Sequence, residues 1–367
     1  MDIYRKALEI VEGGRRAALG LVVHAQGSTP QKVGSKALID DSGRQWGTLG
    51  GGMVEAHGLE RMRHVLAART ADAFEFRLDE RYRRDAGPIC GGVMRIWAMP
   101  LTTEMSAAFR EAAQALARRE RGVLITSFQT DGSVQTRWAR ESSWNGAGDL
   151  PAAEELRRVL AGERPELLTV GDADARLAGT LARPKEHFVE PVAAPPRLLI
   201  VGGGHVGQAV AHQATLLGFD ITVYDDRAEF AQPELFPAGV RAAAGDLRQL
   251  VSEFPQDHDT YIVLVSKGHR PDAEALEGCI HGNAAYMGMI GSKRKIRFLR
   301  KHFLDDGLAT AAEFDRVVAP IGLDIGAVTV PEIGVSIAAQ LIAARRRNRT
   351  DGGSLHAQFH HGPAPAL

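Results

Sequence analysis

The sequence predicts an α/β protein with a C-terminal Rossmann-type doubly wound parallel sheet and a smaller N-terminal α/β (α+β) domain. Three observations predict this class. The second half of the chain alternates short apolar strands with helices, which is typical of a parallel sheet covered on both faces. A glycine motif follows the first of those strands. The chain has 367 residues, which is enough for about two domains at roughly 100–200 residues each.

The charged residues balance almost completely, with 44 Lys and Arg against 45 Asp and Glu and a net charge of −1. This balance argues against a general nucleic-acid binder, which needs a basic surplus to neutralise phosphates. The two cysteines, Cys90 and Cys279, are too few for a disulfide framework, a four-cysteine zinc site or a cubane cluster. We therefore expect a reduced, cytoplasmic compartment.

The N-terminus lacks the basic start and the apolar run of a signal peptide. The most apolar stretches, 197–201, 261–265 and 335–344, are far shorter than the roughly 18 apolar residues that a membrane span needs. The composition thus predicts a soluble protein with neither a membrane nor a nucleic acid as a partner.

Apolar periodicity predicts the elements of the first half, beginning with a helix that carries Ile3, Ala7 and Ile10. The other expected elements are strands at 18–23, 36–39, 73–78, 93–99, 122–126 and 133–138, and helices at 55–68, 104–119 and 152–160. In the second half the expected strands are 197–201, 221–224, 240–243, 261–265 and 285–289, and the expected helices are 206–217, 247–254, 271–281 and 331–347.

Residues 187–196 contain three prolines and are expected to form an extended connector between the domains. The predicted N-terminal domain with its connector spans 1–190. The Rossmann-type domain spans 191–348, and residues 349–367 are expected to form a flexible tail.

The glycine motif is Gly202-x-Gly204-x-x-Gly207, placed between a strand and a helix as nucleotide binding requires. Gly202 would make the tight turn, Gly204 would let a pyrophosphate approach the backbone, and Gly207 would let the helix pack on the strand. The helix N-terminus then offers free N–H groups to an anion. The alternative is a Rossmann fold whose loop holds no dinucleotide.

Three other residues near the motif are candidates for cofactor binding. His205 and Val206 lie within it; His205 is either a ligand-facing group or only the first residue of the helix. Asp225 ends the second strand, about 20 residues on, where a carboxylate can bond a ribose 2′-hydroxyl. NAD(P) is therefore one candidate ligand. None of the five tyrosines has a lysine four residues later, which removes the short-chain dehydrogenase arrangement but not every dehydrogenase class.

Further candidates follow other strands of the second half, since ligands of doubly wound sheets lie outside the carboxyl ends of the strands. His269 is either an acid–base or hydrogen-bonding residue, or a surface histidine. Ser292, Lys293 and Arg294 would form an anion cradle at a helix start, and the later cations of that helix are expected on the surface. Asp324 lies between two glycines and would either meet a ligand or an interface, or cap its own turn.

The first half also contains three candidate loops. Ser28 belongs to a polar loop rich in donors, and Gly51 and Gly52 belong to a run of three glycines that resembles an anion nest. Cys90, before two glycines, is either a reactive or soft-metal-binding thiol or an inert buried one. Cys279 lies in an amphipathic helix and is expected in the core.

Six stretches of the sequence resemble one family, the xanthine dehydrogenase accessory factors, also called the XdhC/CoxI family. They are spread over both halves of the chain, from about residue 18 to 345. The stretches are GSTPQKVGSKALIDDSG, GTLGGGMVE, ICGGVMRIWAMP, LLIVGGGHVGQAVAHQATLLGFDITVYDDRAEFA, YMGMIGSKRK and APIGLDIGAVTVPEIGVSIAAQLI. The sequence departs from the family at Met53, where some members have cysteine, and at Met99, where an acidic residue is common.

The resemblance implies a chaperone for the molybdenum cofactor, a maturation protein rather than a turnover enzyme, often found as a dimer. Such a protein binds the cofactor, assists its sulfuration with a cysteine desulfurase, and delivers it to a client molybdenum hydroxylase such as xanthine dehydrogenase. By our hypothesis the Rossmann glycines and Ser292–Arg294 grip the phosphate of the mono- or dinucleotide cofactor. Cys90 would face its sulfur or metal end. An NAD(P)-dependent oxidoreductase and a nucleotide-sensing scaffold stay open as alternatives.

Overall fold

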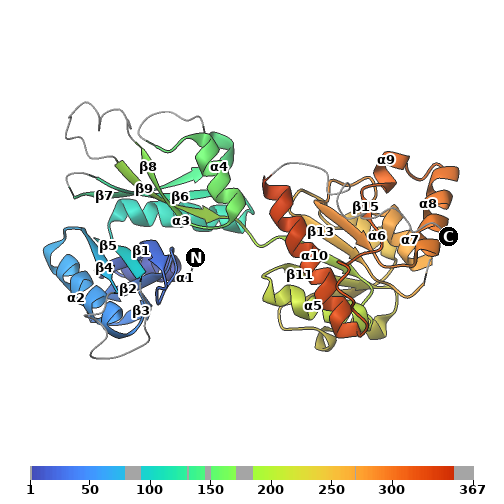
Figure 1. Ribbon diagram of the computed structural model, residues 1–367, viewed down its shortest axis with the longest axis horizontal. Coiled ribbons are helices and arrows are strands. Elements are labelled where there is room, and N and C mark those ends of the chain that lie inside the picture. Colours follow the sequence, from blue (N-terminus) through green and yellow to red (C-terminus); the bar gives the residue numbers. More distant parts are fainter. Residues whose placement is uncertain are drawn as a thin grey trace. The chain divides into compact units, whose positions relative to one another are not determined.

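The structure is a computed structural model that describes residues 2–78, 92–129, 132–144, 150–170, 185–268 and 270–350 (Figure 1). Cys90, His269 and residues 351–367 of the expected tail lie outside the described residues. The chain divides into two compact units, Met1–Ala194 and Pro195–Leu367, which we call unit 1 and unit 2. Unit 1 is the longer one, although the sequence suggests a smaller N-terminal domain.

Unit 1 contains a five-stranded antiparallel sheet that is apolar on both faces. Its central strand, β1, turns Leu19 and Leu21 toward one apolar cluster, and Ala18 and Val22 toward another. This alternation follows from the two-residue period of a strand. The strands, in spatial order, are β3 (Gln45–Gly47), β2 (Lys36–Asp40), β1 (Ala17–Gly27), β5 (Gly92–Pro100) and β4 (Asp72–Arg77).

A second antiparallel sheet of four strands completes unit 1, and four helices cover the two sheets. Its order is β7 (Val134–Arg140), β6 (Gly122–Phe128), β9 (Lys185–Val192) and β8 (Glu166–Val170). Shared apolar clusters place α1 (Asp2–Glu12) and α3 (Thr103–Ala117) between the sheets, α2 (Gly52–Ala68) on the outer face of the first and α4 (Ala153–Gly162) on the outer face of the second.

Strand β9 corrects the expected connector. Residues 187–192 do not leave the domain as a free extended segment, because β9 pairs with β6 on one side and β8 on the other. Pro191 is tolerated near the end of this strand, opposite Val123. The predicted boundary at residue 190 therefore falls inside a strand, and the compact units divide after Ala194.

Unit 2 contains one parallel sheet of six strands, which confirms the predicted Rossmann-type class. Leu199 and Ile200 are both fully buried but belong to clusters on opposite faces of the sheet. The order is β12 (Arg241–Ala244), β11 (Asp220–Asp225), β10 (Arg197–Val201), β13 (Thr260–Leu264), β14 (Tyr286–Met289) and β15 (Val317–Val318).

Helices cover both faces of this sheet. On one face lie α5 (His205–Leu216) and α10 (Val330–Thr350); on the other lie α6 (Leu247–Glu253), α7 (Arg270–Glu277), α8 (Lys293–Asp305) and α9 (Ala311–Phe314). The chain leaves β10 toward β11 and later returns to β13 on the other side of β10. This reversal is the topological switch point, where doubly wound sheets bind their ligands.

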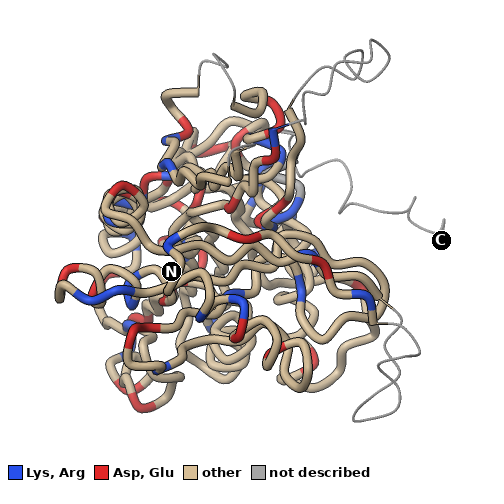
Figure 2. The backbone as a smooth tube through the Cα atoms, turned by 90° about the vertical axis from the view of Figure 1, so that its left-hand side faces the viewer, with Lys and Arg blue, Asp and Glu red and all other residues tan. Residues whose placement is uncertain are grey.

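Basic and acidic residues are not separated into different regions of the described backbone. Figure 2 shows basic and acidic positions interspersed along the chain. Among the described helices, none combines the length and the hydropathy that crossing a bilayer would take.

Candidate functional site

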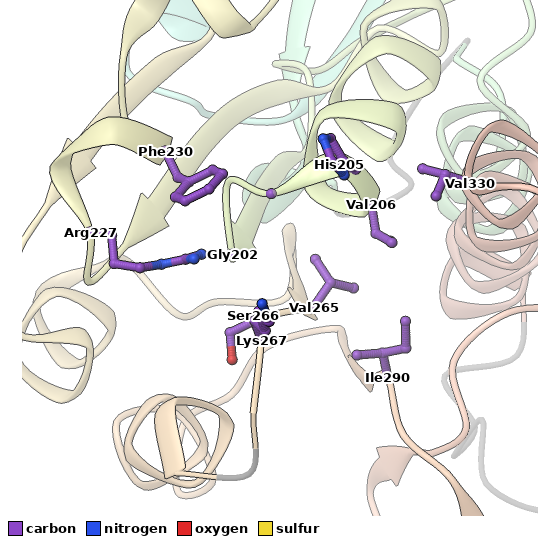
Figure 3. Close-up of a pocket in the computed structure, with 11 residues that line it drawn as sticks. Gly202, His205, Val206, Arg227, Phe230, Val265, Ser266, Lys267, Ile290 and Val330 are labelled. Carbon is purple, nitrogen blue, oxygen red and sulfur yellow. The ribbon is translucent and has the colours of Figure 1, made fainter.

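A pocket of about 380 Å³ lies at the switch point of unit 2 (Figure 3). Its volume falls within the range of about 300–1,000 Å³ typical of small-molecule sites. The lining residues come from the turn after β10, the loop after β11, the ends of β13 and β14 and the start of α10. They are Gly202, Gly204, His205, Val206, Arg227, Phe230, Val265, Ser266, Lys267, Ile290 and Val330.

Three glycines of the turn are required by contacts within the protein. A Cβ on Gly202 would come within 2.7 Å of the Ser266 backbone. A Cβ on Gly203 would come within 1.9 Å of the Phe230 carbonyl oxygen, and one on Gly207 within 1.8 Å of the Gly202 carbonyl oxygen. These distances are too short for any side chain, so close packing alone explains these positions.

Gly204 is different, because nothing in the described part of the chain requires a glycine there. Its φ is −67°, which any residue adopts, and apart from its own chain neighbours no atom of the described residues lies within 4 Å of the position of its missing Cβ. Gly204 also lines the pocket. The absence of a side chain here leaves open space at the place where the sequence predicts a phosphate.

The N-terminus of α5 opens on the same space without a side-chain cap. Gly204 is its N-cap residue and supplies no side-chain oxygen. By contrast, Thr102, Asp246 and Ser292 cap α3, α6 and α8 through their side chains. The first-turn N–H groups of α5, together with the helix dipole, therefore form a suitable site for an anion. His205, which is exposed, and Val206 both line this end of the pocket.

Asp225 is placed where the sequence predicts, at the end of β11, but its carboxylate is already engaged. The residue is 1% exposed. Its oxygens accept the N–H of Gly203 at 2.8 Å and the backbone N–H of Arg227 at 3.0 Å, and they also accept two hydrogen bonds from the Arg227 guanidinium. Burial acts to raise the pKa of this carboxyl, but these hydrogen bonds outweigh it and hold the pKa below its ordinary value.

Arg227 and Phe230 are pocket residues that the sequence patterns did not predict. The guanidinium lies 3.9 Å from the centroid of the Phe230 ring, close enough for a cation–π contact. Figure 3 shows both side chains extending into the pocket from the loop after β11. Arg227 follows the predicted Asp225 by two positions. This spacing of an acidic and a basic residue at a strand end is the sequence feature from which Arg227 could have been predicted as a pocket residue.

The loops after β13 and β14 are joined by a buried carboxylate. Asp272 on α7 is fully buried and accepts hydrogen bonds from Ser266, through both N–H and hydroxyl, and from the Lys295 ammonium. Lys295 also donates to the carbonyls of Gly268 and Ile290. Burial raises the pKa of Asp272 despite these partners. The expectation that Lys295 is one of the surface cations is wrong, since its side chain is only 20% exposed.

The predicted anion cradle on α8 lies outside this pocket lining. Ser292, Lys293 and Arg294 are exposed, and the Ser292 hydroxyl accepts the N–H of Lys295 as the helix cap. Asp324 is exposed as well, and its loop is tied to α10 through neighbouring residues such as Gly322. The binding roles of these four residues stay predictions.

The glycine run of unit 1 is occupied by the chain's own carboxylate. Glu55 accepts hydrogen bonds from the N–H groups of Leu49, Gly50 and Gly51 and from the hydroxyl of Thr48. Burial acts to raise the pKa of Glu55, but these bonds lower it below its ordinary value. The expected anion nest is thus present, although its first N–H groups hold an internal anion. Gly52, the next residue, is exposed.

The structure brings the candidate loops of unit 1 together. A Cβ on Gly92 would come within 2.7 Å of the Ser28 carbonyl oxygen, and one on Gly50 within 2.9 Å of the Pro30 ring. Ser28 itself is exposed. Cys90 precedes Gly92 by two residues but lies outside the described residues, so its role as a thiol or metal ligand stays a prediction.

Cys279 lies in the core, as its sequence position suggests. It is 1% exposed, and its thiol donates to the carbonyl of Ala275. Burial raises its pKa to about 12. Over the described ranges no cluster of three His, Cys, Asp or Glu side chains is arranged to hold a metal ion.

Comparisons with known proteins agree across the whole chain. The chain is 24% identical to a Bacillus subtilis protein named as a probable subunit of xanthine dehydrogenase, over 92% of this chain and 96% of that protein. It is also 24% identical to the uncharacterised protein YqeB of Escherichia coli over 98% of its length, and it spans about half of YqeB, 49%.

A solved structure shares the fold. The crystal structure of a protein described as a xanthine dehydrogenase from Bacillus halodurans superposes with a TM-score of 0.67 at 20% identity, covering 97% of this chain and 99% of that one. Two family models match in order, "XdhC and CoxI family" over residues 10–77 and "XdhC Rossmann domain" over residues 198–341. With one match in each unit, the chain belongs to the XdhC and CoxI family.

Proposed function

We propose that this protein is an accessory protein of a xanthine dehydrogenase-type molybdenum hydroxylase and that its unit 2 pocket binds the molybdenum cofactor. The family membership and the name of the Bacillus subtilis relative support the accessory role. Because the chain spans only half of YqeB, that relative does not define the activity of this chain.

The observation that carries the proposal is Gly204. The described residues make no contact that requires a glycine here, and its missing side chain leaves space open to the pocket, directly at the uncapped N-terminus of α5. A phosphate at this place would accept the first-turn N–H groups of the helix. The molybdenum cofactor is a phosphate-bearing pterin, so its anionic end is complementary to this donor set.

The residues around the turn would hold and shield the cofactor. The apolar side chains of Val206, Val265 and Ile290 line the wall beside the turn and would exclude water from the bound group. The cofactor itself would supply the molybdenum and dithiolene chemistry after delivery to the client. We further propose that Cys90 serves sulfuration with a cysteine desulfurase partner, and that the protein acts in the cytoplasm as a homodimer.

The test is anaerobic purification of the protein from cells that make the cofactor, followed by molybdenum and pterin analysis. The wild-type chain should retain both, and the Gly204→Val variant should retain neither. Gly162→Val is the matched control, because Gly162 on α4 also has open space around its Cβ position but lies in unit 1. Equal retention by both variants would contradict the pocket assignment.

Two further measurements separate this function from the alternatives. Cys90→Ala should abolish delivery of active cofactor to the client hydroxylase, and unchanged delivery would argue against the thiol role. NADH binding should be measured in parallel by fluorescence. Tight NADH binding without any retained or transferable pterin would instead favour the NAD(P)-dependent oxidoreductase.

A further inference from the structure

We propose that the Arg227 end of the pocket takes a ribonucleotide whose ribose carries no phosphate, and that the charge balance around Arg227 sets this preference. The inference rests on the proposed function only in taking the unit 2 pocket as the ligand site. It goes further in naming the class of ligand that the pocket selects. Neither Asp225 nor Arg227 alone determines that class.

The two residues, taken separately, point to opposite ligands. An acidic residue at the end of the second strand favours a ribose 2′-hydroxyl, whereas an arginine near it accommodates a 2′-phosphate. Here the two side chains bond each other, with Asp225 Oδ1 accepting from Arg227 Nε at 3.0 Å and Oδ2 from Nη2 at 3.2 Å. The carboxylate also accepts the backbone N–H groups of Gly203 and Arg227. Arg227, not Asp225, is thus the residue that the ligand meets.

The charge of Arg227 is more than neutralised by its surroundings. Asp225 pairs with it directly, and a carboxylate oxygen of Asp226 lies 3.6 Å from Nε. Glu229, two residues further on, also acts on the guanidinium. Three carboxyl groups therefore act on one guanidinium, and the four groups together carry a net charge of −2 when all are ionised, although burial and the neighbouring Asp225 raise the pKa of Asp226. A second phosphate placed here would be repelled, although an isolated arginine would attract it.

Phe230 limits the movement of the Arg227 guanidinium toward a bound phosphate. The ring stacks on the guanidinium at 3.9 Å, and the bidentate pair with Asp225 fixes its plane. The side chain cannot turn toward a phosphate without losing these contacts. A ribose with free hydroxyls, or the face and edge of a base, needs no such movement and finds a flat, preorganised surface. Of the two ends of the pocket, the Gly204 end therefore favours an anion and the Arg227 end disfavours one.

The experiment compares nucleotides by isothermal titration calorimetry on the full-length chain. The probes are AMP, GMP, CMP and UMP, followed by the nucleoside 2′,5′-bisphosphate of whichever base binds best. We expect the wild-type protein to bind the 5′-monophosphate about tenfold more tightly than the bisphosphate, from Coulomb repulsion at the effective dielectric of a partly exposed site. The ratio should shrink as salt is raised, because the origin is electrostatic.

Two variants and one control variant identify the source of the preference. Asp226→Asn removes one exposed negative charge and should lower the ratio about threefold, chiefly by tighter bisphosphate binding. Glu234→Gln, an exposed change in the following turn (η5, Pro233–Leu235), should leave the ratio unchanged. Arg227→Ala should weaken binding of every nucleotide, since it removes the surface that the ligand contacts.

Three outcomes would overturn the inference: bisphosphate binding as tight as that of the monophosphate, a ratio that does not change with salt, or no binding of any monophosphate. The pterin retention assay distinguishes this from failure of the proposed function. A protein that retains no cofactor but discriminates nucleotides as described would keep the inference and lose the proposed function. A protein that retains the cofactor but binds the monophosphate and the bisphosphate equally well would keep the proposed function and lose the inference.

Discussion

The buried carboxylate of Asp225 and the guanidinium of Arg227 form a two-point pair, at 3.0 Å and 3.2 Å, at the edge of the unit 2 pocket. The same carboxylate accepts the N–H of Gly203 at 2.8 Å. One side chain therefore joins the end of β11, the glycine turn and the pocket wall. Its loss would leave a donor of the turn and a guanidinium without their partner.

We expect Asp225→Ala to lower the free energy of unfolding of unit 2 by about 2–4 kcal/mol, since a buried, fully bonded charge is removed from its pair. Hydrogen exchange measured by mass spectrometry would report the loss on peptides of unit 2 alone. Asp226→Ala, whose side chain is 46% exposed, should change stability by no more than about 0.5 kcal/mol. Equal effects of the two substitutions would contradict the central role of Asp225.

Gly204→Ser should make the ligand-free protein more stable and less able to bind. Serine supplies the side-chain cap that α5 lacks, and it leaves the unfolded chain fewer conformations than glycine does. Together these two effects should raise the free energy of unfolding by about 0.5–1 kcal/mol. Its hydroxyl would occupy the same N–H groups that we assign to the phosphate. Thermal unfolding and cofactor retention should therefore move in opposite directions, whereas loss of both would mean that the turn does not tolerate a side chain.

Glu55→Gln should destabilise unit 1 at neutral pH by about 1–3 kcal/mol, because the glycine run loses its charged acceptor. The folded pKa of Glu55 lies below the unfolded value of about 4.5, so its contribution is complete above that value and is lost as the pH falls through the folded pKa.

Urea unfolding followed by tryptophan fluorescence tests this, since all four tryptophans lie in unit 1. The difference between the wild-type and variant proteins should narrow as the pH is lowered below about 4.5. Glu60→Gln, an exposed position on the same helix, is the control. A difference that is the same at neutral and acid pH would show that the charge of Glu55 plays no part.

Cys279 should not react with a thiol reagent in the native protein. Its thiol is buried and its pKa is about 12, so the thiolate is scarce at pH 8. The Cys90→Ala variant isolates this cysteine. Titration with a disulfide reagent should give no rapid reaction before denaturant is added and one thiol per chain afterwards. A rapid reaction in the native state would place Cys279 outside the core.

The regular part of unit 2 could be predicted from the sequence because each buried strand of the sheet is a short apolar run between turns. The segments 197–201 and 221–224 match β10 and β11 within a residue. Periodicity reports burial, and burial dominates these elements. Strand β8 was missed because Glu166–Val170 is only partly buried and lacks a clear alternation.

The sequence predicts the backbone features of the site but not the partners of its side chains. The glycine turn and Asp225 were found because a turn and a strand end have fixed spacings. Which partner a carboxylate takes depends on side chains that the fold brings together, as with Asp225 and Arg227 or Asp272 and Lys295. The same holds for Glu55, whose place in the glycine run follows from the turn into α2. Residue type alone does not distinguish a nest for a ligand from one that holds its own side chain.

Strand β9 also has a consequence for how the chain is made. It lies between β6 and β8, so the last strand of unit 1 joins the two parts of the second sheet. During synthesis β8 can have no place in this sheet until residues 185–192 have left the ribosome. A nascent chain that stops before residue 185 would expose the edge of β6. Unit 1 should therefore complete its folding only once the last residues of its own sequence have been made.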